Sequence, residues 1–164
     1  MESNSTYYKT PIGFAEIIGD KNGIQSIALL DNSTNEQSSG KFDLPQDIPE
    51  CLQECALQLK EYFKGERTKF DLLLNPQGTS FQKLVWKELC NIPFGKTRSY
   101  LAQSKLIGDP KAVRAVASAN GKNPIWIVVP CHRVIGSDGS LTGYAGDLWR
   151  KKWLLDHESP VKQQ

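Results

Sequence analysis

The chain has 164 residues, which is enough for one or two compact domains, each with a core of its own. Apolar residues make up 39% of the sequence and charged residues 23%, and no apolar run approaches the roughly 18 residues that a membrane span requires. The polar first ten residues predict no secretory signal, and the four cysteines lack disulfide-framework or CxxC spacing. We therefore expect a cytoplasmic, intracellular protein with reduced thiols and no membrane partner.

Charge is divided unevenly between the two halves of the chain. Residues 1–78 carry a net charge of −5, whereas residues 79–164 carry +7. A basic half predicts binding to a polyanion, although ordinary surface variation would give a similar difference. The turn-forming sequence at residues 75–78 marks the best boundary. We predict an N-terminal α/β supporting domain at 1–76 and a C-terminal domain at 77–164.

The first half is predicted to contain strands followed by a helix. Strand-forming residues bounded by turn signals indicate strands at 7–10, 13–17 and 24–29, which favours a small antiparallel sheet. The polar residues 31–47 predict a loop. Pro49 then opens a helix. Its predicted apolar face consists of Leu52, Cys55, Ala56, Leu59 and Phe63.

The second half is predicted to be mostly helical. Ser80 can cap a first helix. A short helix from Ser99 to about Gly108 is followed by Asp109, a predicted N-cap, with Pro110 at the first position of a helix that extends to residue 120. Two short helices joined by a tight turn with glycine form a helix-turn-helix pattern, which also occurs in many proteins that do not bind DNA.

Two further elements flank a cysteine. An apolar run at 125–129 predicts a buried strand that leads into Pro130 and Cys131. After a turn cluster at 136–139, Asp147 can cap the last helix.

Cys131 is the candidate nucleophile. A thiol attacks as its thiolate, and an unperturbed pKa of about 8.5 leaves little thiolate at neutral pH. His132 could take the proton, Arg133 could favour the thiolate through its charge, and Glu158 could orient the imidazole. The simpler interpretation of the same residues is a buried cysteine beside a structural histidine.

The sequence around Cys131 is a long motif rather than a dipeptide. It consists of Asn123-Pro124, residues 127–135 (Ile-Val-Val-Pro-Cys-His-Arg-Val-Ile), Gly143-Tyr144-Ala145-Gly146 and Trp153-Leu154-Leu155. These residues resemble the active-site signature of the O6-alkylguanine-DNA alkyltransferases, also called methylated-DNA–protein-cysteine methyltransferases. The resemblance is nearly continuous over residues 61–158 and holds only in pattern over 1–60. It implies a ribonuclease-H-like N-terminal sheet and a C-terminal helix-turn-helix domain.

The resemblance implies a DNA repair reaction that happens once per molecule. Cys131 would take the alkyl group irreversibly from O6-alkylguanine, and also from O4-alkylthymine, in double-stranded DNA. His132 would deprotonate the thiol through a water-bridged link to Glu158. Tyr100 would donate a proton toward N3 of the leaving guanine, because a purine anion is a poor leaving group.

The resemblance also implies residues that bind DNA. Arg114 would fill the gap left by the flipped nucleotide, and flipping is needed because the alkyl group is buried in the base stack. Ala115 and Ser118, on the same helix, would let its backbone approach the minor groove closely. Tyr100 would contact the DNA as well.

The remaining positions implied by the resemblance form the substrate pocket. Asn123 would brace the active-site turn, Tyr144 would line the pocket, and the Ala145 amide would face O6. The backbone carbonyls of the nucleophile and of Val134 would hold the guanine amino group. Trp126 falls at a wall position and is bulkier than the residue often found there, which predicts lower tolerance for large adducts such as benzyl.

Other expectations concern what is absent or different. Asp147 stands where a glycine is common in the family, and we expect no loss of activity from it. The first half contains no histidine, so no zinc site is expected there, and the reaction implies no cofactor. We expect a monomer.

Two alternative functions belong to other classes. A non-catalytic module that binds alkyl lesions in DNA can use the same scaffold, but such proteins lack the cysteine. A Cys-His hydrolase would need an oxyanion-hole motif, and none is recognisable in the sequence.

Overall fold

The computed structural model describes residues 3–31, 48–141, 144 and 147–160. The chain divides into two compact units, Met1–Gln77 and Gly78–Gln164. The predicted loop at 31–47 falls almost entirely outside the described residues, as does Ala145 of the predicted pocket.

The first unit contains a three-stranded antiparallel sheet, in the order β1–β2–β3. The strands are β1 (Asn4–Thr10), β2 (Gly13–Asp20) and β3 (Gly23–Leu30), so the predicted strands are confirmed and each is longer than predicted. In the turn between β2 and β3, Asp20 Oδ1 accepts a hydrogen bond from the Asn22 amide at 2.8 Å. Gly23 has a φ of 130°, and a Cβ there would lie 2.8 Å from the Leu73 carbonyl oxygen, which explains the glycine.

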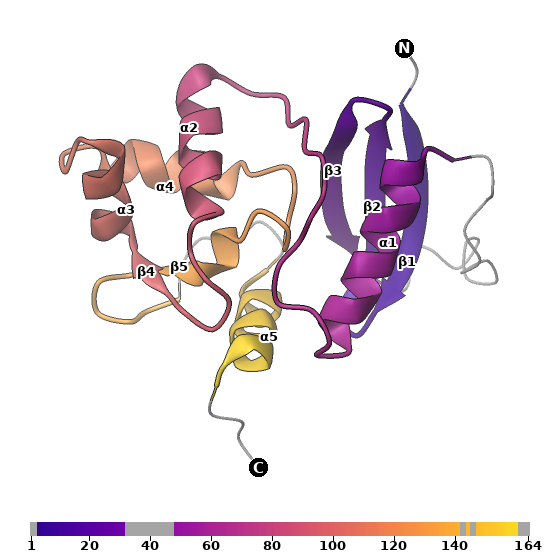
Figure 1. Cartoon of the computed structure of the whole chain (residues 1–164). Helices are drawn as coiled ribbons and strands as arrows, with labels where there is room; N and C mark the ends of the chain where they lie inside the picture. Colours follow the sequence, from indigo (N-terminus) through magenta and orange to yellow (C-terminus); the bar gives the residue numbers. More distant parts are fainter. Residues whose placement is uncertain (1–2, 32–47, 142–143, 145–146, 161–164) are drawn as a thin grey trace. The chain divides into compact units, whose positions relative to one another are not determined.

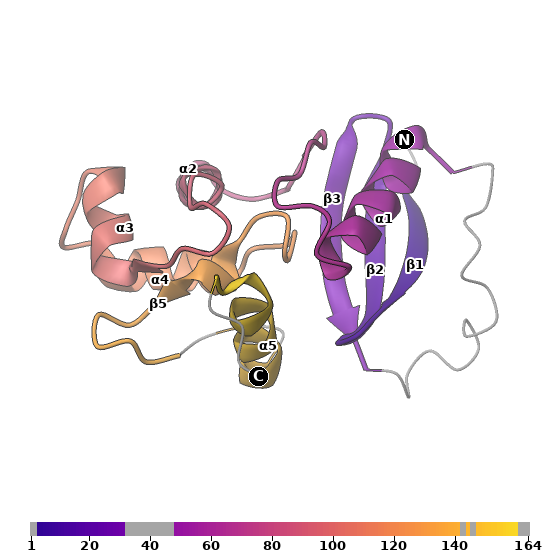
Figure 2. The same ribbon diagram turned by 60° about the horizontal axis from the view of Figure 1, so that its bottom comes forward.

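One helix, α1 (Glu50–Phe63), lies across one face of this sheet (Figures 1 and 2). The helix begins directly after Pro49, as predicted. Its predicted apolar face is correct except at the last turn, where Tyr62 is fully buried and Phe63 is only half-buried. The Tyr62 ring packs against Phe70, with ring centroids 5.5 Å apart.

The second unit is mostly helical. Its helices are α2 (Ser80–Leu89), α3 (Tyr100–Ile107), α4 (Val113–Gly121) and α5 (Leu148–Glu158). A two-residue parallel pair joins β4 (Arg98–Ser99) to β5 (Val134–Ile135). The buried Trp86 indole of α2 donates to the Ala119 carbonyl of α4 at 2.8 Å, which fixes these two helices together. The two units together confirm the predicted fold class.

Figures 1 and 2 show α3 and α4 joined by a short connection, as a helix-turn-helix requires. Ser99 caps α3 by accepting from the Ala102 amide at 3.0 Å, and Gly108 ends α3 with a φ of 103°. The predicted start of α4 is wrong. Asp109 does not cap the helix but holds a turn by accepting from the Lys111 amide at 2.9 Å, and α4 begins only at Val113.

The predicted strand at 125–129 is also wrong, because these residues form a turn. The Val128 amide donates to the Trp126 carbonyl at 2.8 Å, and the Val129 amide donates to the Ile125 carbonyl at 3.1 Å. Ile127 has a φ of 74°, which is rare and strained for a β-branched residue. The apolar side chains at 125 and 127–129 are buried, so the sequence pattern indicated burial correctly and the backbone conformation incorrectly.

Two predicted helix caps differ in the structure. Thr79, and not Ser80, caps α2, because its hydroxyl accepts from the Gln82 amide at 3.1 Å and Gln82 Oε1 accepts from the Thr79 amide at 2.9 Å. This reciprocal pair is a capping box. Asp147 precedes α5 but makes no side-chain cap bond, and its φ of 74° explains why glycine suits this position.

We expect Thr79→Ala to lower the free energy of unfolding by about 1 kcal/mol, because it removes the cap and leaves an amide of the first turn unpaired. Ser80→Ala serves as the matched control and should change stability by less than about 0.5 kcal/mol. Thermal unfolding of the full chain, followed by calorimetry, measures both variants. An equal loss in the two variants would contradict the assignment of the cap.

Candidate active site

Cys131 lies in a single 3-10 turn, Cys131–Arg133, which follows Pro130 and leads directly into β5. All three residues of this turn are buried, and Cys131 is 4% exposed. The turn therefore places a thiol, an imidazole and a guanidinium next to one another inside the second unit.

The carboxylate of Glu158, at the end of α5, binds both residues that follow Cys131. His132 Nε2 and Glu158 Oε2 are 2.8 Å apart. Arg133 Nε donates to Glu158 Oε1 at 2.7 Å, and Arg133 Nη2 donates to Glu158 Oε2 at 3.0 Å. The link from imidazole to carboxylate is thus direct, and the water-bridged link expected between them is wrong.

The protonation states follow from these contacts. Burial alone would raise the pKa of Glu158, but the adjacent His132 and Arg133 reverse the effect and hold it well below its ordinary value. Burial lowers the pKa of His132 despite the opposing charge of Glu158, so the imidazole is neutral at neutral pH. With Glu158 ionised, the single proton of the neutral ring belongs on Nε2. Nδ1 is then a bare acceptor, and in the described part of the chain it has no hydrogen-bond partner.

The thiol itself is held in its protonated form. Burial raises the pKa of Cys131 to about 11, while the Asn123 side chain and the charge of Lys151 lower it in part. Because the thiol is protonated at neutral pH, nucleophilic attack requires a base that takes its proton. Nδ1 of the neutral His132 carries no proton and can act as that base.

Asn123 braces the turn that precedes Cys131. Its Nδ2 donates to the Val129 carbonyl at 2.8 Å and to the Ile125 carbonyl at 3.3 Å. Its Oδ1 accepts from the Ile125 amide at 2.9 Å. One buried side chain therefore holds the strained turn at Ile127 in place.

Lys151 is a buried cation that the sequence interpretation missed. Its Nζ donates to the Val134 carbonyl at 2.7 Å and lies 5.9 Å from the centre of the Tyr100 ring. Burial lowers the pKa of Lys151 to about 8, so the amine is still mostly protonated at neutral pH. Lys151, and not Arg133, is the cation that lowers the pKa of the thiol. The usable signal was its spacing from Leu154 and Glu158, which places all three on one helix face.

Three of the predicted pocket residues, Asn123, Trp126 and Tyr144, are linked by contacts through Trp126. The Trp126 and Tyr144 rings have centroids 5.8 Å apart, and the Trp126 indole donates to the Asn123 carbonyl at 3.0 Å. The Tyr144 hydroxyl is buried without a hydrogen-bond partner among the described residues. Tyr100 is half-buried at the start of α3, close to Lys151.

The predicted DNA-binding residues share one face of α4. Arg114, Ala115 and Ser118 are all exposed, whereas Val116 and Ala119 face the core. The same helix reaches the active-site turn through Asn120, whose Nδ2 lies 3.4 Å from the Cys131 carbonyl oxygen.

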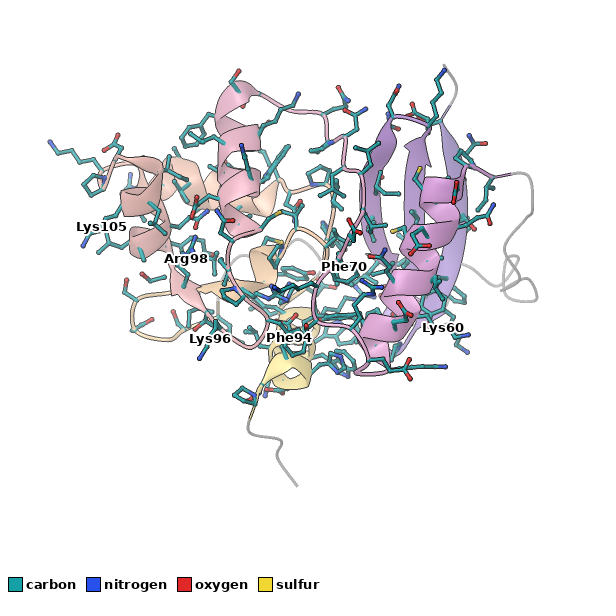
Figure 3. All side chains as sticks on the ribbon, viewed as in Figure 1. Lys60, Phe70, Phe94, Lys96, Arg98 and Lys105 are labelled. Carbon is teal, nitrogen blue, oxygen red and sulfur yellow. The ribbon has the colours of Figure 1, made fainter. Side chains whose placement is uncertain are left out.

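Arg133 completes the support of the turn from another direction. Its Nη1 donates to the Ile92 carbonyl at 2.7 Å, and its Cζ lies 5.8 Å from the centre of the Phe94 ring (Phe94 is labelled in Figure 3). The segment after α2 is therefore fixed to the active-site turn by a buried guanidinium.

The described residues hold neither a metal-binding cluster nor a membrane-spanning helix. They contain no group of three or more His, Cys, Asp or Glu side chains that could hold a metal ion. None of the helices in the described ranges is both long enough and apolar enough to span a bilayer.

Family models match almost the whole chain. The ribonuclease-like domain of 6-O-methylguanine DNA methyltransferase matches residues 5–76, and the DNA binding domain of the same family matches residues 80–160. The chain belongs to the 6-O-methylguanine DNA methyltransferase family. The resemblance inferred from the sequence is thereby confirmed.

Relatives and solved structures agree with this membership. The methylated-DNA–protein-cysteine methyltransferase of Methanosarcina barkeri is 46% identical over 92% of this chain and 93% of its own length. That of Mycobacterium tuberculosis strain H37Rv is 45% identical over 93% of this chain and 92% of its own length. The M. tuberculosis OGT structure in complex with DNA superposes with a TM-score of 0.79 at 44% identity, covering 94% of each chain.

We expect Lys151→Met to raise the pKa of the Cys131 thiol by about one unit, because it removes a nearby cation while keeping a similar side-chain length. The measurement is the pH dependence of Cys131 alkylation by iodoacetamide, mapped by peptide mass spectrometry. Lys152→Met is the matched control, since Lys152 is exposed and pairs with Asp156 at 2.8 Å. An unchanged pH midpoint in Lys151→Met would show that its charge does not reach the thiol.

Proposed function

We propose that this protein repairs DNA by moving the alkyl group of O6-alkylguanine, and of O4-alkylthymine, irreversibly onto Cys131. The observation that carries the proposal is the arrangement of Cys131, His132 and Glu158, in which a buried thiol adjoins a neutral imidazole held by an ionised carboxylate. Family membership and the names of the relatives support the same reaction. Each molecule reacts once, because a thioether has no easy reverse route in water.

The chemical step is a displacement at the alkyl carbon. His132 Nδ1 takes the thiol proton, the sulfur of the resulting thiolate forms a bond to carbon, and the bond from carbon to O6 breaks. The electron pair leaves with guanine, and the Tyr100 hydroxyl donates toward N3 to neutralise it. The charge of Lys151, which lies near both the thiol and the Tyr100 ring, favours the thiolate before the transfer.

DNA binding is assigned to the exposed face of α4. Arg114 occupies the gap left by the flipped base, and the small side chains of Ala115 and Ser118 allow a close approach to the minor groove. The DNA complex of the M. tuberculosis relative supports binding of DNA. The pocket for the flipped base consists of Asn123, Trp126, Val134, Tyr144 and Ala145. A monomer acting in the cytoplasm, without a cofactor, remains a prediction.

The direct test is intact-mass spectrometry after incubation with a duplex that contains O6-methylguanine. We expect one added methyl group per protein, located on Cys131, because the thioether consumes the nucleophile. Cys131→Ala should show no transfer, and Cys90→Ala, which changes an exposed cysteine, should react like the parent. Tight lesion binding by the parent without a change in mass would instead favour the non-catalytic lesion-binding module.

Trp126 is expected to limit the size of the alkyl group. Its ring packs against the Tyr144 ring at a tilt of 49°, with centroids 5.8 Å apart. Trp126→Ala should raise the rate of benzyl transfer relative to methyl transfer by about tenfold, in the range that a change in a hydrophobic pocket produces. Single-turnover rates on the two substrates give this ratio, in which a general loss of folded protein cancels. An unchanged ratio would remove Trp126 from the pocket wall.

A further inference from the structure

Three buried side-chain polar atoms in the described ranges lack a hydrogen-bond partner, and all three belong to residues around Cys131. They are Asn120 Oδ1, His132 Nδ1 and the Tyr144 hydroxyl. Leaving such an atom unpaired costs roughly 1–3 kcal/mol, and native proteins normally satisfy these atoms with ordered water or a ligand. The cluster therefore indicates that something polar occupies this region of the working protein.

Two of the three atoms already have roles in the proposed reaction. His132 Nδ1 receives the thiol proton, and Tyr144 lines the pocket for the base. Asn120 has no such role, although it is 2% exposed and its Nδ2 lies 3.4 Å from the Cys131 carbonyl oxygen. It lies near the end of α4, the helix whose exposed face carries Arg114.

The contact with Cys131 decides which way the Asn120 amide points. A backbone carbonyl only accepts hydrogen bonds, so the NH₂ group must face Cys131 and Oδ1 must face elsewhere. Oδ1 is an acceptor. His132 Nδ1 is an acceptor too, since the ring proton lies on Nε2 beside Glu158. Two acceptors cannot bond each other, but one water molecule can donate a hydrogen to each of them.

We propose that Asn120 is a positioning residue whose Oδ1 holds the water that carries the Cys131 proton to His132. The inference rests on the proposed function. The S–H group donates to the water oxygen, and the water donates one hydrogen to His132 Nδ1 and the other to Asn120 Oδ1. As the proton moves, the S–H bond breaks and a new O–H bond forms, while the O–H bond toward His132 breaks and an N–H bond forms. The products are a thiolate, an imidazolium and the same water.

The amide of Asn120 thus does two things at once. Its Nδ2 holds the carbonyl of the nucleophile. Its Oδ1 accepts a hydrogen bond from the water, through the hydrogen that is not transferred. Without that second contact the water can rotate, and the chain from thiol to imidazole forms less often. Because only the thiolate attacks, a smaller population of the thiolate and imidazolium pair appears directly as slower alkyl transfer.

The test is Asn120→Leu, which keeps a similar shape and removes both polar atoms. We expect the single-turnover rate of methyl transfer to Cys131 to fall about tenfold, and the pH midpoint of iodoacetamide alkylation at Cys131 to rise by about one unit, since one pKa unit is a tenfold change in thiolate. Asn91→Leu is the matched control, because it is the same substitution at an exposed position of the same unit.

A second variant, Asn120→Asp, keeps the shape of the side chain and so does not depend on how Leu packs. When protonated, its carboxyl can donate to the Cys131 carbonyl and accept from the water, as Asn120 does. When ionised, it loses the donor and places a negative charge beside the thiol. We therefore expect its transfer rate, relative to the parent at the same pH, to rise as the pH falls. A merely structural role gives a ratio that does not vary with pH.

The outcomes separate this inference from the function on which it rests. If the parent transfers methyl to Cys131 and folded Asn120→Leu does so at the same rate with the same pH midpoint, the relay role of Asn120 is wrong and the repair function stands. If Asn120→Leu does not fold, a pH-independent ratio for Asn120→Asp overturns the inference instead. If the parent itself transfers no methyl group, the proposed function fails and the inference fails with it.

Discussion

The carboxylate of Glu158 is the constraint on which the active-site turn depends. Burying an ion is costly unless it is paired and hydrogen bonded, and here the contact with His132 and the charge and two donated bonds of Arg133 keep Glu158 ionised. An ionised Glu158 in turn fixes the ring proton of His132 on Nε2 and leaves Nδ1 free to accept a hydrogen bond. Arg133 therefore acts on the thiol only indirectly, through the carboxylate it neutralises.

One face of α5 supplies both charges that the thiol requires. Lys151, Leu154 and Glu158 recur at helical spacing, and all three are buried. Seven residues of helix rise about 10.5 Å, so Lys151 and Glu158 are too far apart to neutralise each other. Each is left to act on its own target, with Lys151 stabilising the thiolate and Glu158 orienting the imidazole. The fully buried Leu154 lies between them along the same helix face.

Local patterns in the sequence predicted most of the fold, and they failed where a tertiary contact decides. The strands and α1 were predictable because alternation, turns and Pro49 all agree. The turn around Ile127 was not, because an apolar run fits a buried turn as well as a strand, and the bonds from Asn123 make the choice. In the site, the motif placed His132 beside the thiol, but Lys151 was hidden in a basic run that is typical of a solvated helix face.

A protein that reacts only once is inactivated if its nucleophile reacts with another electrophile. Thiolates react readily with oxidants and small alkylating agents, whereas thiols react slowly. Burial raises the pKa of Cys131 to about 11, so the sulfur rests as an inert thiol. The neutral imidazole and the Lys151 charge make the thiolate accessible without making it the resting state. Burial raises the pKa of Cys131, and the polar groups around it oppose that increase. This opposition explains why so many polar groups surround a buried thiol.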